Sequence, residues 1–133
     1  MNRALFVCLV AIVSCFLAGC GQTTVIGNIT LDGTPLSKGD ISFTPVSEGS
    51  VLTGQIDSSG NYQLRLGTGT AIPTGSYRVK IVAVEPVAPT RENPEPLPKL
   101  LTPARYGDVS TSGLTADVKA GPNKFDFKLS SMP

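Results

Sequence analysis

Histidine and tryptophan are both absent from this chain of 133 residues. Because histidine is the side chain that titrates near neutral pH and the commonest protein ligand of transition metals, its absence excludes histidine-based acid–base catalysis. Charge is also scarce, with eleven basic and ten acidic residues and a formal net charge of +1. No basic stripe is present that would attract nucleic acid. We therefore expect no metal, no cofactor and no nucleic-acid partner.

A long apolar run is missing too, although the chain begins with a short one. Residues 4–17 are apolar apart from Ser14 and two cysteines, and Arg3 precedes them. A membrane-spanning helix needs about 20 apolar residues, whereas a shorter apolar run after a basic start is typical of a secretory signal. We therefore predict a signal peptide over residues 1–19 that is removed on export.

The apolar run ends in the tetrapeptide Leu17-Ala18-Gly19-Cys20. This tetrapeptide resembles the lipobox of bacterial lipoproteins. The resemblance implies that the Cys20 thiol receives a diacylglycerol, that the chain is cut between Gly19 and Cys20, and that the new amino group is acylated. Two acyl chains suffice for stable anchoring. Residues 20–23 would then be a lipidated tether that holds the protein on a bacterial membrane.

The plainer interpretation is that Cys20 is one more apolar residue of the run, like Cys8 and Cys15. Gly21 follows Cys20 in place of the aspartate that marks inner-membrane retention in some bacteria, so the outer membrane is favoured. Removal of residues 1–19 would leave Cys20 as the only cysteine of the chain. No intramolecular disulfide is then available, and an apolar core must stabilise the domain.

Glycine and proline, with 14 and 11 residues respectively, divide the rest of the chain at short intervals. Between them, segments rich in Val, Ile, Thr, Tyr and Phe alternate apolar and polar residues, as strands with one buried face do. Turns are indicated by Asp32-Gly33, Ser59-Gly60-Asn61 and Gly121-Pro122-Asn123. We predict an all-β fold over residues 24–133, a seven-stranded antiparallel β-sandwich with Greek-key connections. The predicted strands cover residues 25–31, 41–46, 52–57, 62–66, 76–83, 114–118 and 125–129.

Residues 85–107 depart from this alternation and hold six of the eleven prolines. Proline cannot donate a ladder hydrogen bond, so we do not expect a central strand here. One interpretation is a stiff, solvated loop without a ligand. The other is a recognition loop, because a long excursion from a compact domain is often functional. That loop would present Leu97, Leu100, Leu101 and Tyr106 to a partner.

Two segments carry a repeated pattern, first of Asp, Gly and Tyr and then of Pro, Gly and Tyr. The matching residues are Asp57, Gly60, Tyr62 and Leu64, followed by Pro73, Gly75, Tyr77 and Val79. At these positions, and in the opening segment 25–45, the chain resembles the carboxypeptidase regulatory-like family. The resemblance implies a transthyretin-like, Ig-like β-sandwich of the kind used as an accessory, adhesion or scaffold module.

Each of these motif residues also has a structural role that needs no ligand. Gly60 allows a tight hairpin, and the Asp57 carboxylate can accept hydrogen bonds from turn amides. Tyr62 and Tyr77 supply aromatic area that faces inward. The motif therefore specifies a fold and carries no chemistry of its own.

The expected function is that of a non-catalytic lipoprotein of the bacterial cell envelope. The membrane would be its first partner, through the lipid on Cys20. The exposed domain would bind or scaffold an envelope protein or a polysaccharide.

An exported hydrolase is one alternative, but transthyretin-like hydrolases that act on 5-hydroxyisourate depend on histidine, and this chain has none. The Ser-Lys pairs available to an enzyme are Ser37 with Lys38 and Ser76 with Lys80. Glu92 and Glu95 lie in the proline-rich segment, where nothing indicates the burial that acid–base catalysis needs.

A second alternative is an adhesin-type module that is cross-linked by an isopeptide bond. The candidate partners are Asn28, Asn61 and Asn123 with Lys80 and an acidic residue, Glu85 or Asp117. A third is a calcium site in the turn formed by residues 57–61, but its single carboxylate is too few for a good site.

Overall fold

Nearly all the regular structure of this protein is β-strand, which confirms the predicted all-β class. The computed structural model describes residues 22–66 and 71–133, and within them the only helical element is a 3₁₀ turn, η1, at Ala104–Gly107. The strands are β1 (Thr24–Leu31), β2 (Thr34–Pro35), β3 (Gly39–Pro45), β4 (Leu52–Ile56), β5 (Asn61–Gln63), β6 (Gly75–Val82), β7 (Val84–Glu85), β8 (Lys99–Leu100), β9 (Leu114–Val118), β10 (Pro122–Lys124) and β11 (Phe127–Leu129).

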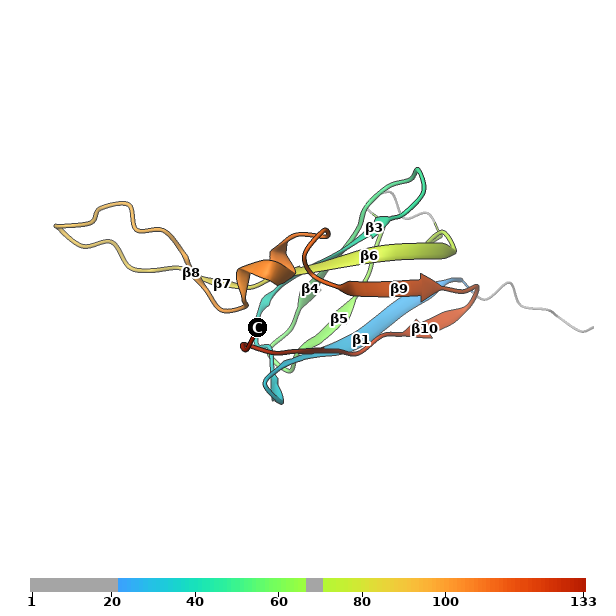
Figure 1. The fold of residues 1–133 in the computed structure, drawn as a ribbon, viewed down its shortest axis with the longest axis horizontal. Helices are drawn as coiled ribbons and strands as arrows, with labels where there is room; N and C mark the ends of the chain where they lie inside the picture. Colours follow the sequence, from blue (N-terminus) through green and yellow to red (C-terminus); the bar gives the residue numbers. More distant parts are fainter. Residues whose placement is uncertain (1–21, 67–70) are drawn as a thin grey trace, which may run out of the picture.

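Nine of these strands form one curled sheet (Figure 1). Its order is β10-β1-β5-β4-β3-β6-β9, and β2 and β11 also pair with β1. Figure 1 shows β3, β6 and β9 on one side of the curl and β1, β5 and β10 on the other. The two remaining strands, β7 and β8, form a separate ladder. The curl therefore encloses a space between two groups of strands, and the core lies there.

One edge of the sheet is parallel. β1 runs in the same direction as β10 and β11, with Thr24 opposite Pro122 and Ile29 opposite Phe127. The other pairs of named strands are antiparallel, as predicted. Parallel neighbours need a long connection, and these are the first and last strands, so almost the whole domain connects them. Alternation within a strand does not reveal its direction, which is why the prediction missed this edge.

Each of the seven predicted strands overlaps a strand of the structure, but the count of seven is too low. The structure adds β2, β10 and the β7–β8 ladder, whose strands have two or three residues each. Segments this short show no alternation that a sequence pattern could reveal. The strands predicted at 62–66 and 125–129 are both shorter than expected, because β5 ends at Gln63 and β11 begins only at Phe127.

The core is built from the inward-facing residues of the alternating strands. Phe43, on β3, is fully buried at its centre. Its ring centroid lies 6.0 Å from that of Tyr77, 6.1 Å from those of Phe125 and Phe127, and 6.4 Å from that of Tyr62. Tilted and edge-on aromatic contacts at this spacing stabilise a core beyond the area they bury.

The proline-rich segment forms a projecting arm, which we define as residues 84–101 (Figure 1). Val84 lies opposite Leu100, and Glu85 opposite Lys99, so the β7–β8 ladder closes its base. Further out, the chain turns back at residues 90–93, where the Thr90 N–H donates to the Asn93 carbonyl at 2.9 Å. As predicted, the segment contributes no central strand, because its only described strands form this separate ladder.

The arm and the start of β1 lie at opposite ends of the molecule (Figure 1). The Thr24 N–H donates to the Gly121 carbonyl at 3.1 Å, and the same end holds Gly75, which pairs with Val118. β6 runs away from this end over eight residues, and the arm follows it after Ala83. Eight extended residues span about 26 Å, so the body of the sheet separates the chain's entry point from the arm.

Candidate functional site

The predicted cleavage and lipidation residues, Gly19 and Cys20, lie outside the described residues, as does the whole predicted signal peptide. The first described residue is Gln22, and β1 begins at Thr24. The prediction for Cys20 stays a prediction.

The predicted turn motif forms a tight hairpin between β4 and β5. The Asp57 carboxylate accepts hydrogen bonds from the N–H groups of Ser59 and Asn61, both at 2.9 Å. Gly60 has a φ of 83°, and a Cβ there would lie 2.6 Å from the Ile29 carbonyl oxygen. The predicted roles of Asp57 and Gly60 are therefore confirmed. Because Oδ1 of the carboxylate already accepts two N–H groups, this arrangement favours a turn over a calcium site.

Asp57 leads to a prediction about acid stability. The backbone N–H groups of Asn61 and Ser59 lower the pKa of the Asp57 carboxyl. Because its folded pKa lies below the unfolded value of about 4, the unfolded chain binds more protons in that range, so stability falls as the pH falls. Urea unfolding should give a constant free energy between about pH 7 and 5 and a decline below about pH 4. The decline should be shallower in Asp57→Asn, and an identical decline in both proteins would contradict this role.

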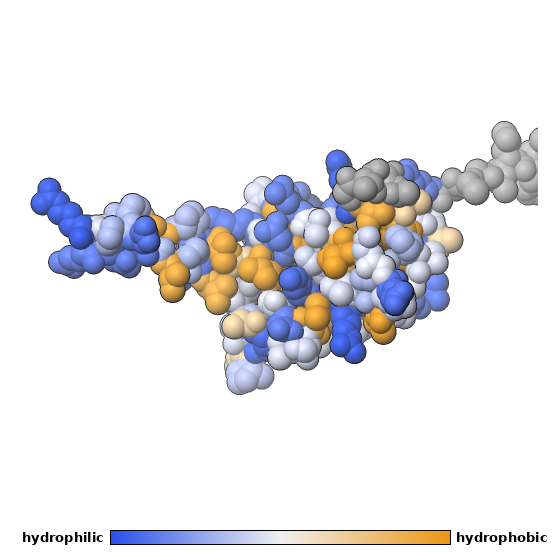
Figure 2. All heavy atoms as spheres, turned by 90° about the horizontal axis from the view of Figure 1, so that it is seen from above, coloured by the Kyte–Doolittle hydropathy of each residue, from blue (hydrophilic) through white to orange (hydrophobic). Residues whose placement is uncertain are grey.

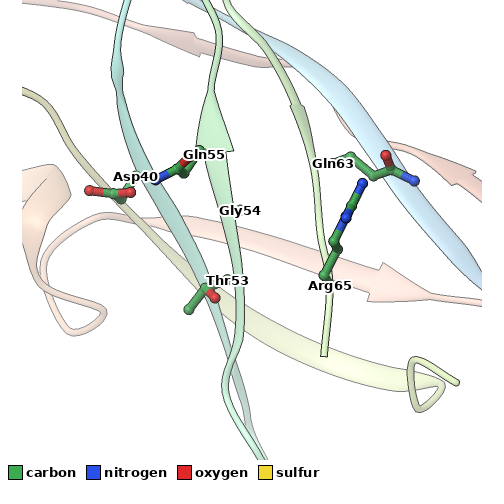
Figure 3. Close-up of a pocket in the computed structure, with 6 residues that line it drawn as sticks. All are labelled: Asp40, Thr53, Gly54, Gln55, Gln63 and Arg65. Carbon is green, nitrogen blue, oxygen red and sulfur yellow. The ribbon is translucent and has the colours of Figure 1, made fainter. Parts of the chain in front are cut away.

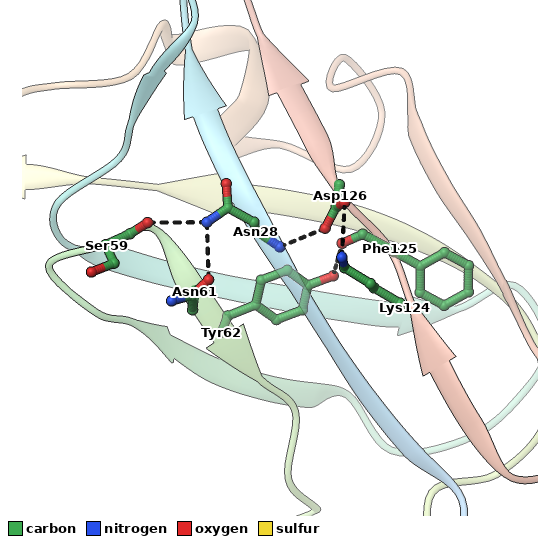
Figure 4. A network of polar contacts seen from close by, with 7 residues as sticks. All are labelled: Asn28, Ser59, Asn61, Tyr62, Lys124, Phe125 and Asp126. Carbon is green, nitrogen blue, oxygen red and sulfur yellow. Dashed lines mark hydrogen bonds and ion pairs between the residues drawn. The ribbon is translucent and has the colours of Figure 1, made fainter.

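Both motif tyrosines face inward, as predicted, and both hydroxyls donate to backbone carbonyls. The Tyr62 hydroxyl donates to the Phe125 carbonyl at 2.6 Å, and the Tyr77 hydroxyl donates to the Pro73 carbonyl at 2.8 Å (Figure 4 shows Tyr62). Burial raises the pKa of both tyrosines. The two hydroxyls therefore stay protonated and serve the fold. Gly75, which is also a motif residue, has a φ of 141°, which favours glycine.

The structure separates the four residues that were predicted to form a binding loop. Leu97 and Leu100 are exposed on the arm, at 87% and 52%. Leu101 is partly buried against the core, and Tyr106 is buried at 7% exposure. Only the first two can be presented to a partner, so the expectation for Tyr106 is wrong. Its burial depends on the C-terminal tail, which no local pattern predicts.

Tyr106 and its neighbour Arg105 hold the C-terminal tail against the body. The Arg105 guanidinium lies 4.7 Å from the centroid of the Tyr106 ring and donates to the Ser130 and Met132 carbonyls. The Ser130 N–H donates to the Tyr106 hydroxyl at 3.0 Å. Although burial raises the pKa of Tyr106, the Ser130 N–H and Arg105 together lower it below its usual value. This cluster joins residues 105 and 106, which follow the arm, to the C-terminal tail.

Two exposed valines of the arm were missed by the sequence analysis. Val84 and Val87 are 41% and 45% exposed, and together with Leu97 and Leu100 they give the arm four exposed aliphatic side chains. Figure 2 shows apolar residues at the base of the arm and hydrophilic residues at its tip. The signal that could have revealed them is a spacing of three, 84 to 87 and 97 to 100, which is the period of a polyproline helix.

The asparagines considered for a cross-link are engaged elsewhere. The Asn28 amide donates to the Ser59 carbonyl and to the Asn61 side chain, both at 3.0 Å (Figure 4). The Asn123 amide donates to the Lys119 carbonyl at 2.8 Å and also contacts the Thr24 and Gly121 carbonyls. These bonds tie turns and strand ends together, which favours a structural role. Of the lysines considered for catalysis, Lys38 lies 3.7 Å from Glu85 in an exposed ion pair.

A polar hollow of about 510 Å³ lies on the outer face of β3, β4 and β5 (Figure 3). Sequence reasoning missed it, because its residues come from three strands that are separated in the sequence. In Figure 3, Asp40 and Gln55 lie on one side, Gln63 and Arg65 on the other, and the backbone of Gly54 between them. A second hollow of about 320 Å³ shares Asp40 and Gln55 and extends to the base of the arm. The residues that line the first hollow are Asp40, Thr53, Gly54, Gln55, Gln63 and Arg65.

In residues 22–66 and 71–133, no helix is both long and apolar enough to cross a membrane. In the same part of the chain, no three His, Cys, Asp or Glu residues come together as a metal site requires. Comparison with models of known protein families and with the sequences of curated proteins finds no match to this chain.

Proposed function

We propose that this chain is a lipid-anchored, non-catalytic binding module of the bacterial cell envelope. In this proposal the chain is cleaved before Cys20, the lipidated cysteine anchors it in a membrane, preferably the outer one, and the β-domain binds a partner at the membrane surface. The proposal combines the lipobox-like residues 17–20 with the arrangement of the domain that follows them.

The observation that carries this proposal is the placement of the arm at the end of the domain opposite to the start of β1 (Figure 1). A tether of residues 20–23 could span at most about 14 Å, so the start of β1 would stay near the bilayer. The arm would then point away from the membrane, with the length of β6 in between. Four exposed aliphatic side chains at that position favour an envelope protein as the partner of the arm.

The proposed fold type is a Greek-key β-sandwich like that of the carboxypeptidase regulatory-like family. Its support is the curled sheet, in which β3, β6 and β9 face β1, β5 and β10 across an aromatic core (Figure 1). The motif turn at Asp57 and the inward tyrosines also agree with this type. Such domains carry function through their surfaces, which supports a binding role.

A non-catalytic role is supported by how the motif residues are used. The Tyr62 and Tyr77 hydroxyls donate to backbone carbonyls, and the Asp57 carboxylate accepts turn N–H groups. A general acid or base needs a polar group that is free to exchange a proton with a substrate. These groups serve the fold, and histidine is absent.

The anchor is tested by labelling cells with an alkyne analogue of palmitate. Wild-type protein and Cys15→Ser should both take up the label, because Cys15 would be removed with the signal peptide. Cys20→Ser should lose the label, since it lacks the sulfur that accepts the diacylglycerol. Label on Cys20→Ser, or none on the wild type, would refute the anchor.

A further inference from the structure

Four polar side chains line the hollow on the outer face of the sheet and have no side-chain partner among the described residues. They are exposed residues from three strands: Asp40 of β3, Gln55 of β4, and Gln63 and Arg65 at and just after β5. Within residues 22–66 and 71–133, these four side chains form no hydrogen bond or ion pair with another side chain or with the backbone.

Several charged residues elsewhere on the described surface are paired with a neighbour. Lys119 pairs with Asp117 at 3.0 Å, and Lys124 pairs with Asp126 at 3.7 Å. The carboxylates of other aspartates accept backbone N–H groups, as Asp57 does in its turn. A cation, an anion and two amides that line one concave surface without such partners leave their hydrogen-bonding capacity for a ligand.

Strand register sets the spacing of these groups. Asp40 lies directly opposite Gln55 in the β3–β4 pair, and Thr53 lies opposite Arg65 in a bridge between β4 and the chain after β5. The anion and the cation are therefore two strands apart and two residues apart along the strands, which places their backbones about 12 Å from each other. This is the extended length of about three residues of a peptide.

We propose that this hollow binds a short extended peptide that carries both a free carboxylate and a free amine. The Arg65 guanidinium offers parallel N–H donors that match a carboxylate, and the Asp40 carboxylate accepts from an ammonium group. The amides of Gln55, on the side of Asp40, and of Gln63, on the side of Arg65, each offer a donor and an acceptor to the C=O and N–H groups of the peptide (Figure 3). Gly54, between these residues, lines the hollow with its backbone (Figure 3).

The lining favours this ligand over other polar polymers. None of its residues is aromatic, so the hollow has no ring face for a sugar or a nucleobase. One cation and one anion give no net charge to attract a polyanion. The adjoining hollow adds Lys38, Val82 and Val84, which can receive a further residue of the peptide. The site does not depend on the lipid anchor, because all its residues belong to the folded domain.

The test is calorimetric titration of the full-length chain, purified in detergent, with acetyl-Lys-Ala-Ala. This probe has one free amine and one free carboxylate. Because the hollow is open, we expect a dissociation constant on the order of 0.1–1 mM. The C-terminal amide of the peptide, and the form acetylated on the lysine side chain, should each bind at least about tenfold more weakly.

Matched variants assign each charge to its partner. Arg65→Gln should weaken binding of the free acid about tenfold and abolish the preference for acid over amide. Arg78→Gln, at an exposed arginine on β6, should leave that preference unchanged. Asp40→Asn should abolish the preference for the free amine, with exposed Asp117→Asn as its control. Unchanged melting temperatures would show that these exposed substitutions leave the fold intact.

The proposal would be overturned by equal binding of the three peptides, by no binding up to about 5 mM peptide, or by equal losses in Arg65→Gln and Arg78→Gln. Binding of chitotriose in place of the peptide would also overturn it, because a neutral sugar has neither of the charges that define the site.

Discussion

Replacing Gly27 with alanine is expected to destabilise the protein by more than about 3 kcal/mol, a large fraction of the stability of an ordinary domain. Gly27 lies on β1, where the chain crosses the junction between β10 and β11. A Cβ at this position would lie 1.8 Å from the Phe125 carbonyl oxygen and 2.8 Å from the Tyr62 ring. Two non-bonded heavy atoms cannot approach so closely, so the strands would have to separate.

The cost is large because the obstructing atom belongs to the backbone and has a second role. The Phe125 carbonyl accepts the Tyr62 hydroxyl at 2.6 Å (Figure 4), and the Phe125 N–H donates to the Ile26 carbonyl at 2.9 Å. Moving Phe125 away from Gly27 would break both bonds and leave a buried hydroxyl without a partner, which costs about 1–3 kcal/mol on its own.

The free energies of unfolding of the wild type and of Gly27→Ala, measured in urea, give the size of the effect. Gly107→Ala is a matched control, because a Cβ there would meet only the Val82 side chain, at an ordinary 3.5 Å. We expect Gly107→Ala to change the free energy of unfolding by less than about 1 kcal/mol. If Gly27→Ala were as stable as this control, the close approach of β1 to Phe125 would be wrong.

Truncation of Phe43 to alanine has the second largest expected effect, a loss of about 3–5 kcal/mol. Phe43 is fully buried, and four aromatic rings surround it, the nearest at 6.0 Å. Its removal would forfeit the transfer free energy of the ring and leave a cavity that the paired strands cannot close. Because β3 lies between β4 and β6, the backbone around Phe43 has little freedom to relax.

Leu97→Ala is the control for this substitution, because it also removes a large apolar side chain but at a site that is 87% exposed. We expect its unfolding midpoint to match that of the wild type. A comparable loss in the two variants would mean that the arm contributes to the core of the domain. A small loss in Phe43→Ala would contradict the central position of its ring.

Residue alternation and turn preferences predicted the features that depend only on residues close together in the sequence. Alternation placed Tyr62 and Tyr77 inside, and turn chemistry placed Asp57 and Gly60 in a hairpin, as the structure has them. Each of these predictions needs only a few consecutive residues. The all-β class follows from the same periods repeated along the chain.

The features that were missed depend on contacts between distant residues. Tyr106 is buried because Ser130 and Arg105 engage its hydroxyl, and no pattern near Tyr106 indicates where the C-terminal tail runs. The hollow forms because the register of β3 against β4 sets Asp40 opposite Gln55, and alternation within each strand does not fix that register. The β7–β8 ladder of the arm was not predicted, because the prolines around it indicate a segment without strands.

Lipid attachment at Cys20 is tested most directly by mass spectrometry of the N-terminal peptide of the protein extracted from membranes. We predict a chain that begins at Cys20 and carries a diacylglycerol on the sulfur, with or without an acyl group on the amine. A chain that still begins at Met1, or one with a free thiol at Cys20, would contradict it.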